Sequence, residues 1–228
     1  MNVEYIFFGF IGFIILGFII FSHFFTEKAI VKRKLKKAPL KKIKNFRNGQ
    51  TARIVGQVVP VNEALKAPLS GRACAEYHVE VQQKKSQGKS SKWVKVIDDQ
   101  KSIPFLIKEG DHFAIIEASE KRSYIVKDAK FDSGFLNDAS PKLKQYLKNH
   151  GHDDENWLGM NKSFKYHEGI LEPGEKIAVY GEGRWVTAQE LELPEAFGKI
   201  LVMQSGMDAL YISDDPDTLQ FEKKKESY

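Results

Sequence analysis

Cys74 and His78 are the residues whose types most directly suggest chemistry, because a thiol beside an imidazole can act as an activated nucleophile. They are four positions apart in a segment that alternates small or apolar residues with polar ones, as a strand does. Both side chains would share one face of that strand, but about 13 Å apart at roughly 3.3 Å per residue. Proton transfer needs hydrogen-bond contact. We therefore interpret Cys74 as a packed thiol and assign no catalytic residue.

A second group, His150, His152 and Asp153, has side chains that can bind a metal in a loop. Gly151 between the histidines is typical of a helix end, and further acids follow, which favours a solvated loop instead. The chain also lacks HExxH, GxSxG, Walker A and Rossmann sequences. We expect no metal site and no cofactor, with an undetected hydrolase activity as the alternative.

The longest apolar stretch runs from residue 5 to residue 25 and contains no charged residue. As a helix it would be about 31 Å long, which matches a hydrocarbon core about 30 Å thick. The flank before it has no cation and no small-residue cleavage site follows, which indicates an anchor rather than a signal peptide. We predict that residues 1–27 form a short flank and a single transmembrane helix. The residues expected to anchor it in the membrane are Tyr5, Phe8, Phe13, Leu16, Phe21 and Phe25.

Residues 28–47 carry ten Lys and Arg residues and no acid. Because loops rich in these cations stay cytoplasmic, we expect the N-terminus outside and the rest inside, at the plasma or inner membrane if the protein is bacterial. We predict a basic linker over residues 28–49, helical to about Lys37 and interrupted by Pro39. It either only fixes topology or also binds anionic headgroups of membrane lipids. The residues assigned to headgroup contact are Lys32, Arg33, Lys34, Lys36, Lys37, Lys41 and Lys42.

The formal charge of +5 is unevenly distributed along the chain. Residues 1–27 carry −2 and residues 28–47 carry +10, which leaves −3 for the remainder. A nucleic-acid-binding body needs clustered cations on its folded surface to neutralise phosphates. We therefore expect no nucleic-acid partner.

The remaining residues predict a mainly β body over residues 50–215 and a charged, flexible tail over residues 216–228. We expect a small β-barrel or sandwich, possibly of two lobes, with one short helix that begins after Ser140 and ends near Gly151. Gly56 is predicted to be a bulge or a point of close approach. The polar stretch 82–92 is predicted to be a loop between two hairpin strands. The expected strands are 51–61, 73–81, 93–97, 103–107, 112–118, 123–131, 176–186, 200–205 and 210–214.

Three tryptophans can be weighed as binding residues. Trp93 and Trp185 lie in predicted strands and are interpreted as residues of the core or of a lobe interface. Trp157 lies in a predicted loop beside Leu158 and Met160, where the three could anchor a partner or the bilayer surface. The alternative is a loop folded back onto the body.

Several separated blocks resemble the GIDE-type, or BAM ("beside a membrane"), domain of mitochondrial ubiquitin ligase activators and shorter bacterial membrane proteins. They occur in the expected order over about residues 50–215, after the apolar span. The blocks are GQV with LKAPLSGRACAEYHVEV within 56–81, Trp93, IPFLI at 103–107, YLKNHG at 146–151, YHEGILEPGEKIAVYGEGRW at 166–185 and LYIS at 210–213.

This resemblance implies a membrane-associated domain but does not imply ubiquitin-transfer activity. The ligases of the family end in a RING, which holds two zinc ions with about eight Cys and His ligands, whereas this sequence has one cysteine. We therefore expect a RING-less form, with a noncatalytic module that binds a protein or small ligand at the cytoplasmic face. The alternatives are an enzyme or accessory of ubiquitin-like conjugation, for which an E3 ubiquitin ligase label would rest on resemblance alone, and a structural subunit of a membrane complex.

Overall fold

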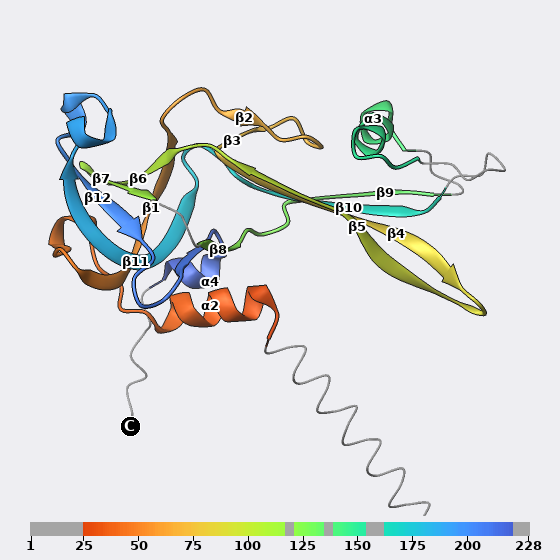
Figure 1. Cartoon of the computed structure of the whole chain (residues 1–228), viewed down its shortest axis with the longest axis horizontal. Coiled ribbons are helices and arrows are strands. Elements are labelled where there is room, and N and C mark those ends of the chain that lie inside the picture. The colour runs from red at the N-terminus through yellow and green to blue at the C-terminus, as the bar shows by residue number, and fades with distance from the viewer. Residues whose placement is uncertain (1–24, 117–120, 135–138, 154–161, 221–228) are drawn as a thin grey trace, which may run out of the picture.

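The structure is a computed structural model that describes residues 25–116, 121–134, 139–153 and 162–220, and the fold is mainly β (Figure 1). The helices are α2 (Glu27–Lys37), α3 (Pro141–Asn149) and α4 (Pro216–Leu219), with 3-10 turns at Ile43–Asn45, Gln189–Leu191 and Glu195–Phe197. The strands are β1 (Gln50–Pro60), β2 (Leu65–Lys66), β3 (Ala73–Cys74), β4 (Glu76–Gln87), β5 (Ser90–Ser102), β6 (Phe105–Glu109), β7 (His112–Ile116), β8 (Lys121–Tyr124), β9 (Ala129–Ser133), β10 (Phe164–Leu171), β11 (Lys176–Thr187), β12 (Lys199–Gln204) and β13 (Leu210–Ser213).

Five strands close into a small barrel. β1 pairs with β6 on one side and with β11 on the other, while β7 and β12 complete the circle between β6 and β11. All neighbours are antiparallel except β7 and β12, and this connectivity is that of OB-type barrels. β13 and β8 extend the sheet from β11.

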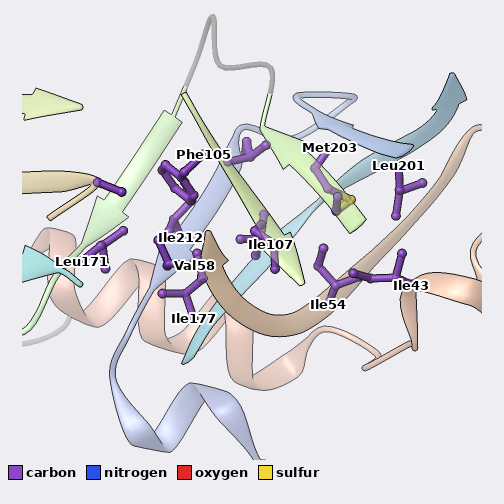
Figure 2. Packing of buried hydrophobic residues seen from close by; sticks show 14 of the residues in the cluster. Ile43, Ile54, Val58, Phe105, Ile107, Leu171, Ile177, Leu201, Met203 and Ile212 are labelled. Atoms are coloured by element: carbon purple, nitrogen blue, oxygen red, sulfur yellow. The ribbon is translucent and has the colours of Figure 1, made fainter. Parts of the chain in front are cut away.

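The barrel interior is filled by alternating apolar residues of these strands, as Figure 2 shows. Ile54 and Val58 of β1 and Ile177 and Val179 of β11 are at most 1% exposed. Removal of this apolar surface from water is the main favourable term in folding the barrel. Ile43, from the segment that leads into β1, is fully buried in the same cluster.

A second, four-stranded sheet in the order β5-β4-β10-β9 projects from the barrel as an arm (Figure 1). Helix α3 packs Leu143, Tyr146 and Leu147 into a separate core with Val79 and Phe164 of the arm. Among the described residues, the two largest buried clusters lie in the barrel and in the arm.

Most predicted strands are present, but several segments differ. The strand predicted over residues 123–131 is split into β8, in the barrel sheet, and β9, in the arm, and β10 was not predicted. The polar stretch predicted as a loop continues the β4–β5 hairpin as far as the Gln87↔Ser90 pair, with Gly88 in the left-handed region at φ +63°. The predicted strand 73–81 breaks at Ala75, whose N–H donates to Leu171 O at 2.8 Å. Within it Val79 is buried on the predicted apolar face, whereas Ala73 is exposed.

The predicted helix after Ser140 is confirmed. The Ser140 hydroxyl accepts the Leu143 N–H at 3.4 Å, and Pro141 occupies the first turn. The C-cap is His150, and Gly151 follows with φ +74°. The described residues form three α-helices: α3, α2, which was predicted as the helical part of the linker, and α4, which was not predicted.

Helix α2 ends at Lys37 as predicted, but it does not behave as a free linker. Val31 and Leu35 are fully buried against Tyr180 and Tyr211 of the barrel sheet. The prediction of a flexible tail over residues 216–228 is wrong for residues 216–219. These residues form α4, which packs on α2 and β11, and its Thr218 is fully buried. The ordered body therefore includes both segments that flank the predicted β domain.

The predicted transmembrane helix falls almost entirely outside the described residues. Among the residues that the structure describes, no helix combines the length and apolar character needed to cross a membrane.

Candidate functional site

The cations of α2 fall into two groups once the helix is docked. Lys32 Nζ lies 2.8 Å from the Asp215 carboxylate and 3.0 Å from that of Asp217. Lys34 Nζ lies 2.6 Å from Asp208 and 4.8 Å from the centre of the Tyr180 ring. The hydrogen bonds to Asp215 and Asp208 raise the pKa of Lys32 and Lys34 respectively. These two lysines connect α2 to the body.

Other predicted headgroup residues are placed toward the surface. Arg33, Lys36 and Lys37 are exposed, with Lys36 only 3.9 Å from Asp217. They line a shallow surface depression on α2 together with Lys32. The outer side of α2 therefore stays basic, as the sequence predicted.

Lys41 and Lys42 line a different feature, which we call the basic groove. It has a volume of about 1070 Å³ and lies between the segment after α2, strand β1, the β6–β7 turn and the end of α4. Its cations are Lys41, Lys42, Lys108 and Lys176. Its apolar wall is formed by Leu40, Val55 and Leu219.

Strand register positions two of these lysines. Gln57 of β1 pairs with Lys108 of β6 on one side and with Lys176 of β11 on the other. Directly opposed residues in a sheet have Cβ atoms about 4.5–5.5 Å apart and point to the same side. All three residues are exposed. The barrel thus presents a Lys-Gln-Lys row to solvent at the edge of the groove.

The other two lysines are positioned by the segment that follows α2. The Lys41 N–H donates to Arg53 O at 2.8 Å, and Leu40 forms a β-bridge with Arg53. The Ile43 N–H donates to the Glu109 carboxylate at 2.6 Å, while the Ile43 side chain is buried in the barrel core. This segment is therefore fixed along β1.

Lys108 and Lys176 were not identified as site residues from the sequence. They are 68 positions apart and belong to separate strands. Each lies at the polar end of a strand, which is an ordinary place for a lysine. Only the pairing of both strands with β1 brings them together, and a single sequence does not specify that pairing.

A second surface of the barrel is covered by the chain itself. In OB-type barrels the second and third strands commonly bind ligands, and here these strands are β6 and β7. Residues 188–198 pack Leu191, Leu193 and Phe197 over them, with the Phe113 and Phe197 rings 4.9 Å apart and perpendicular. The basic groove is the more open candidate.

The residues considered as catalytic or metal-binding candidates do not form a common site. Cys74 is buried in a small apolar cluster, and burial raises the pKa of its thiol to about 11. His78 Nε2 lies 2.6 Å from Asp98. His150 contacts the Tyr146 carbonyl and His152 the Val96 carbonyl. Within the described ranges, no three His, Cys, Asp or Glu residues are grouped to hold a metal.

The tryptophans differ from one another. Trp185 packs against the barrel core, and its indole N–H donates to Phe46 O at 3.0 Å, as expected for a core residue. Trp93 was expected in a core but is 37% exposed on the arm, with Lys165 Nζ 4.4 Å from its ring centre. Trp93 belongs to the β4–β5 hairpin, in which residues 82–92 were predicted to be a loop and residues 93–97 a strand. Both faces of this part of the hairpin are exposed to solvent.

The remaining predicted site residues are outside the described ranges. These are the anchor residues Tyr5, Phe8, Phe13, Leu16 and Phe21 and the candidate partner-binding residues Trp157, Leu158 and Met160. Phe25, the last predicted anchor residue, is 58% exposed just before α2.

Comparison of the chain with protein-family models, with curated proteins and with solved structures gave no match.

Proposed function

We propose that this protein is a single-span membrane protein whose body is a noncatalytic binding module, held beside the cytoplasmic face of the membrane. The apolar segment 5–25 supplies the anchor and the cations that follow it favour cytoplasmic placement of the body. A RING-less GIDE- or BAM-like domain is the family proposal, which rests on the order of the sequence blocks described above.

The packing of α2 is the observation that carries the proposal. The helix begins two residues after the apolar segment, and its Val31 and Leu35 are fully buried against the body. Ion pairs from Lys32 and Lys34 reinforce this contact. A body attached in this way is kept within a short distance of its anchor instead of moving on a flexible tether.

The arm is the proposed site of partner binding. It extends from the barrel, and its outer strands β5 and β9 each pair on one side only within the described sheet (Figure 1). Unpaired strand edges can accept a further strand from a partner. The segment with Trp157, Leu158 and Met160 lies in sequence between α3 and β10, both of which belong to the arm.

The proposed module is tested by affinity purification of the tagged full-length protein from detergent-solubilised native membranes, followed by mass spectrometry. We expect a discrete partner that is retained by wild type and by Trp185→Phe but weakened at least severalfold by Trp157→Ala. Equal partner recovery with Trp157→Ala would remove residues 157–160 from the proposal. Absence of any specific partner with wild type would contradict the protein-binding function.

A further inference from the structure

The basic groove combines cations from three parts of the chain. Lys41 and Lys42 come from the segment after α2, Lys108 from β6 and Lys176 from β11. Among the described residues that line it, the only acid is Glu109. The Glu109 carboxylate accepts the Ile43 N–H at 2.6 Å, so part of its hydrogen-bonding capacity is already used. The lining therefore has a formal charge of +3.

These cations are not neutralised by the body in the way that Lys32 and Lys34 are. In the described ranges, no ion pair within 4.0 Å joins Lys41, Lys42, Lys108 or Lys176 to an acid. Several ammonium groups on a concave surface attract a compact anion, because each neutralises part of its charge and donates hydrogen bonds.

The groove also has features that favour a lipid over a free anion. Leu40, Val55 and Leu219 form an apolar wall beside the lysines, which suits a molecule with a charged head and apolar chains. Leu40 is three residues after the end of α2, and α2 starts two residues after the end of the apolar segment. The 11 residues of α2 span only about 16 Å.

We infer that the basic groove binds the phosphate headgroup of an anionic phospholipid. Lys108 and Lys176, on either side of Gln57, hold the phosphate together with Lys41 and Lys42, while the apolar wall contacts the first part of the acyl chains. This inference rests on the proposed membrane function, since the lipid must come from the bilayer that holds the anchor.

The test uses the full-length protein in an uncharged detergent and native mass spectrometry with added phosphatidylglycerol or phosphatidylcholine. The groove variants are Lys108→Gln with Lys176→Gln, and Gln57→Glu, which places a carboxylate between the two lysines. The matched control is Lys85→Gln with Lys92→Gln, since these exposed lysines also face each other across paired strands, on the arm. All substituted positions are exposed, so thermal unfolding should be unchanged.

We expect wild type and control to retain phosphatidylglycerol preferentially and both groove variants to lose roughly tenfold or more in its apparent affinity, as cations near a lipid surface contribute individually. Equal loss in groove and control variants would overturn the site, because it would show a nonspecific charge effect. Inorganic phosphate that displaces the lipid at equal concentration would overturn the lipid assignment in favour of a soluble phosphate compound.

Failure of this inference is separable from failure of the membrane proposal. Wild type and groove variants should all remain in the membrane fraction after alkaline carbonate washing. A chain that leaves the membrane in that wash contradicts the anchor, whereas a retained chain with no preference for phosphatidylglycerol contradicts only the groove.

Discussion

Gly56 lies where β1 passes close to β6. A Cβ at this position would be 2.6 Å from the Lys108 carbonyl oxygen and 2.7 Å from Ile107 Cγ2. Because the carbonyl belongs to a paired strand, Gly56→Ala must push the two strands apart. We expect a loss of about 1–3 kcal/mol in the free energy of unfolding, measured by chemical denaturation of the full-length protein in detergent.

Gly88 provides the control for this substitution. It has φ +63°, and a Cβ at this position would have no atom within 4 Å. Asn tolerates such a backbone. Gly88→Asn should change stability by less than about 0.5 kcal/mol. Equal effects of the two substitutions would contradict the close approach at Gly56, which the sequence had correctly indicated.

Asp214 makes stability depend on pH. Burial raises the pKa of its carboxyl from 3.8 to about 7, although the Val126 N–H donates to it at 2.8 Å. At pH values between about 4 and about 7, the Asp214 carboxyl is protonated in the folded protein but ionised in the unfolded chain. The free energy of unfolding therefore falls as the pH rises through this range.

Asp214→Asn should remove this dependence, because an amide cannot ionise and its oxygen can still accept the Val126 N–H. We expect the variant to be more stable than wild type by about 1–3 kcal/mol at pH 8, with a smaller difference at pH 5. Chemical denaturation at both pH values measures this. A difference that is the same at pH 5 and pH 8 would exclude Asp214 as the source.

At the scale of elements, α2 is predicted to be held mainly by its apolar face. Leu35 is fully buried, and replacement of a buried Leu by Ala typically costs about 2–5 kcal/mol. Leu35→Ala should therefore release the helix and accelerate tryptic cleavage within residues 28–37 of the full-length protein by tenfold or more.

The contrast for Leu35→Ala is Asp217→Asn, which removes a carboxylate from the surface pairs with Lys32 and Lys36. Exposed ion pairs contribute little, so this change should accelerate cleavage far less. A cleavage rate unaffected by Leu35→Ala would mean that α2 is not docked in solution.

Local patterns predicted individual elements well and their partners poorly. Ser140 and Pro141 marked the start of α3, and Pro39 follows α2 closely, because capping and proline effects act over a few residues. The hairpin tip between Lys84 and Lys92 was missed because its exposed ribbon has no apolar alternation. The docking of α2 was missed because Val31 and Leu35 are few among many lysines.

At the scale of the molecule, the mainly β class was predictable, but the closure of the barrel was not. Closure depends on which strands pair with β1. The sequence does not determine which residues of those strands lie opposite Gln57. The same limit applies to the prediction of the candidate site. Lys41 and Lys42 were predicted from charge density, whereas Lys108 and Lys176 become neighbours of the groove only through the β1–β6 and β1–β11 pairings.

In the proposed arrangement, the chain would cross the membrane once, and α2 would hold a cytoplasmic body beside the anchor. Protease protection in sealed, carbonate-washed native membrane vesicles of both orientations tests this arrangement most directly. We predict that the full-length chain remains in the washed membranes and that the body is digested in inside-out vesicles but protected in right-side-out ones. Digestion of the body in right-side-out vesicles, or release of the chain by the wash, would contradict the proposed arrangement.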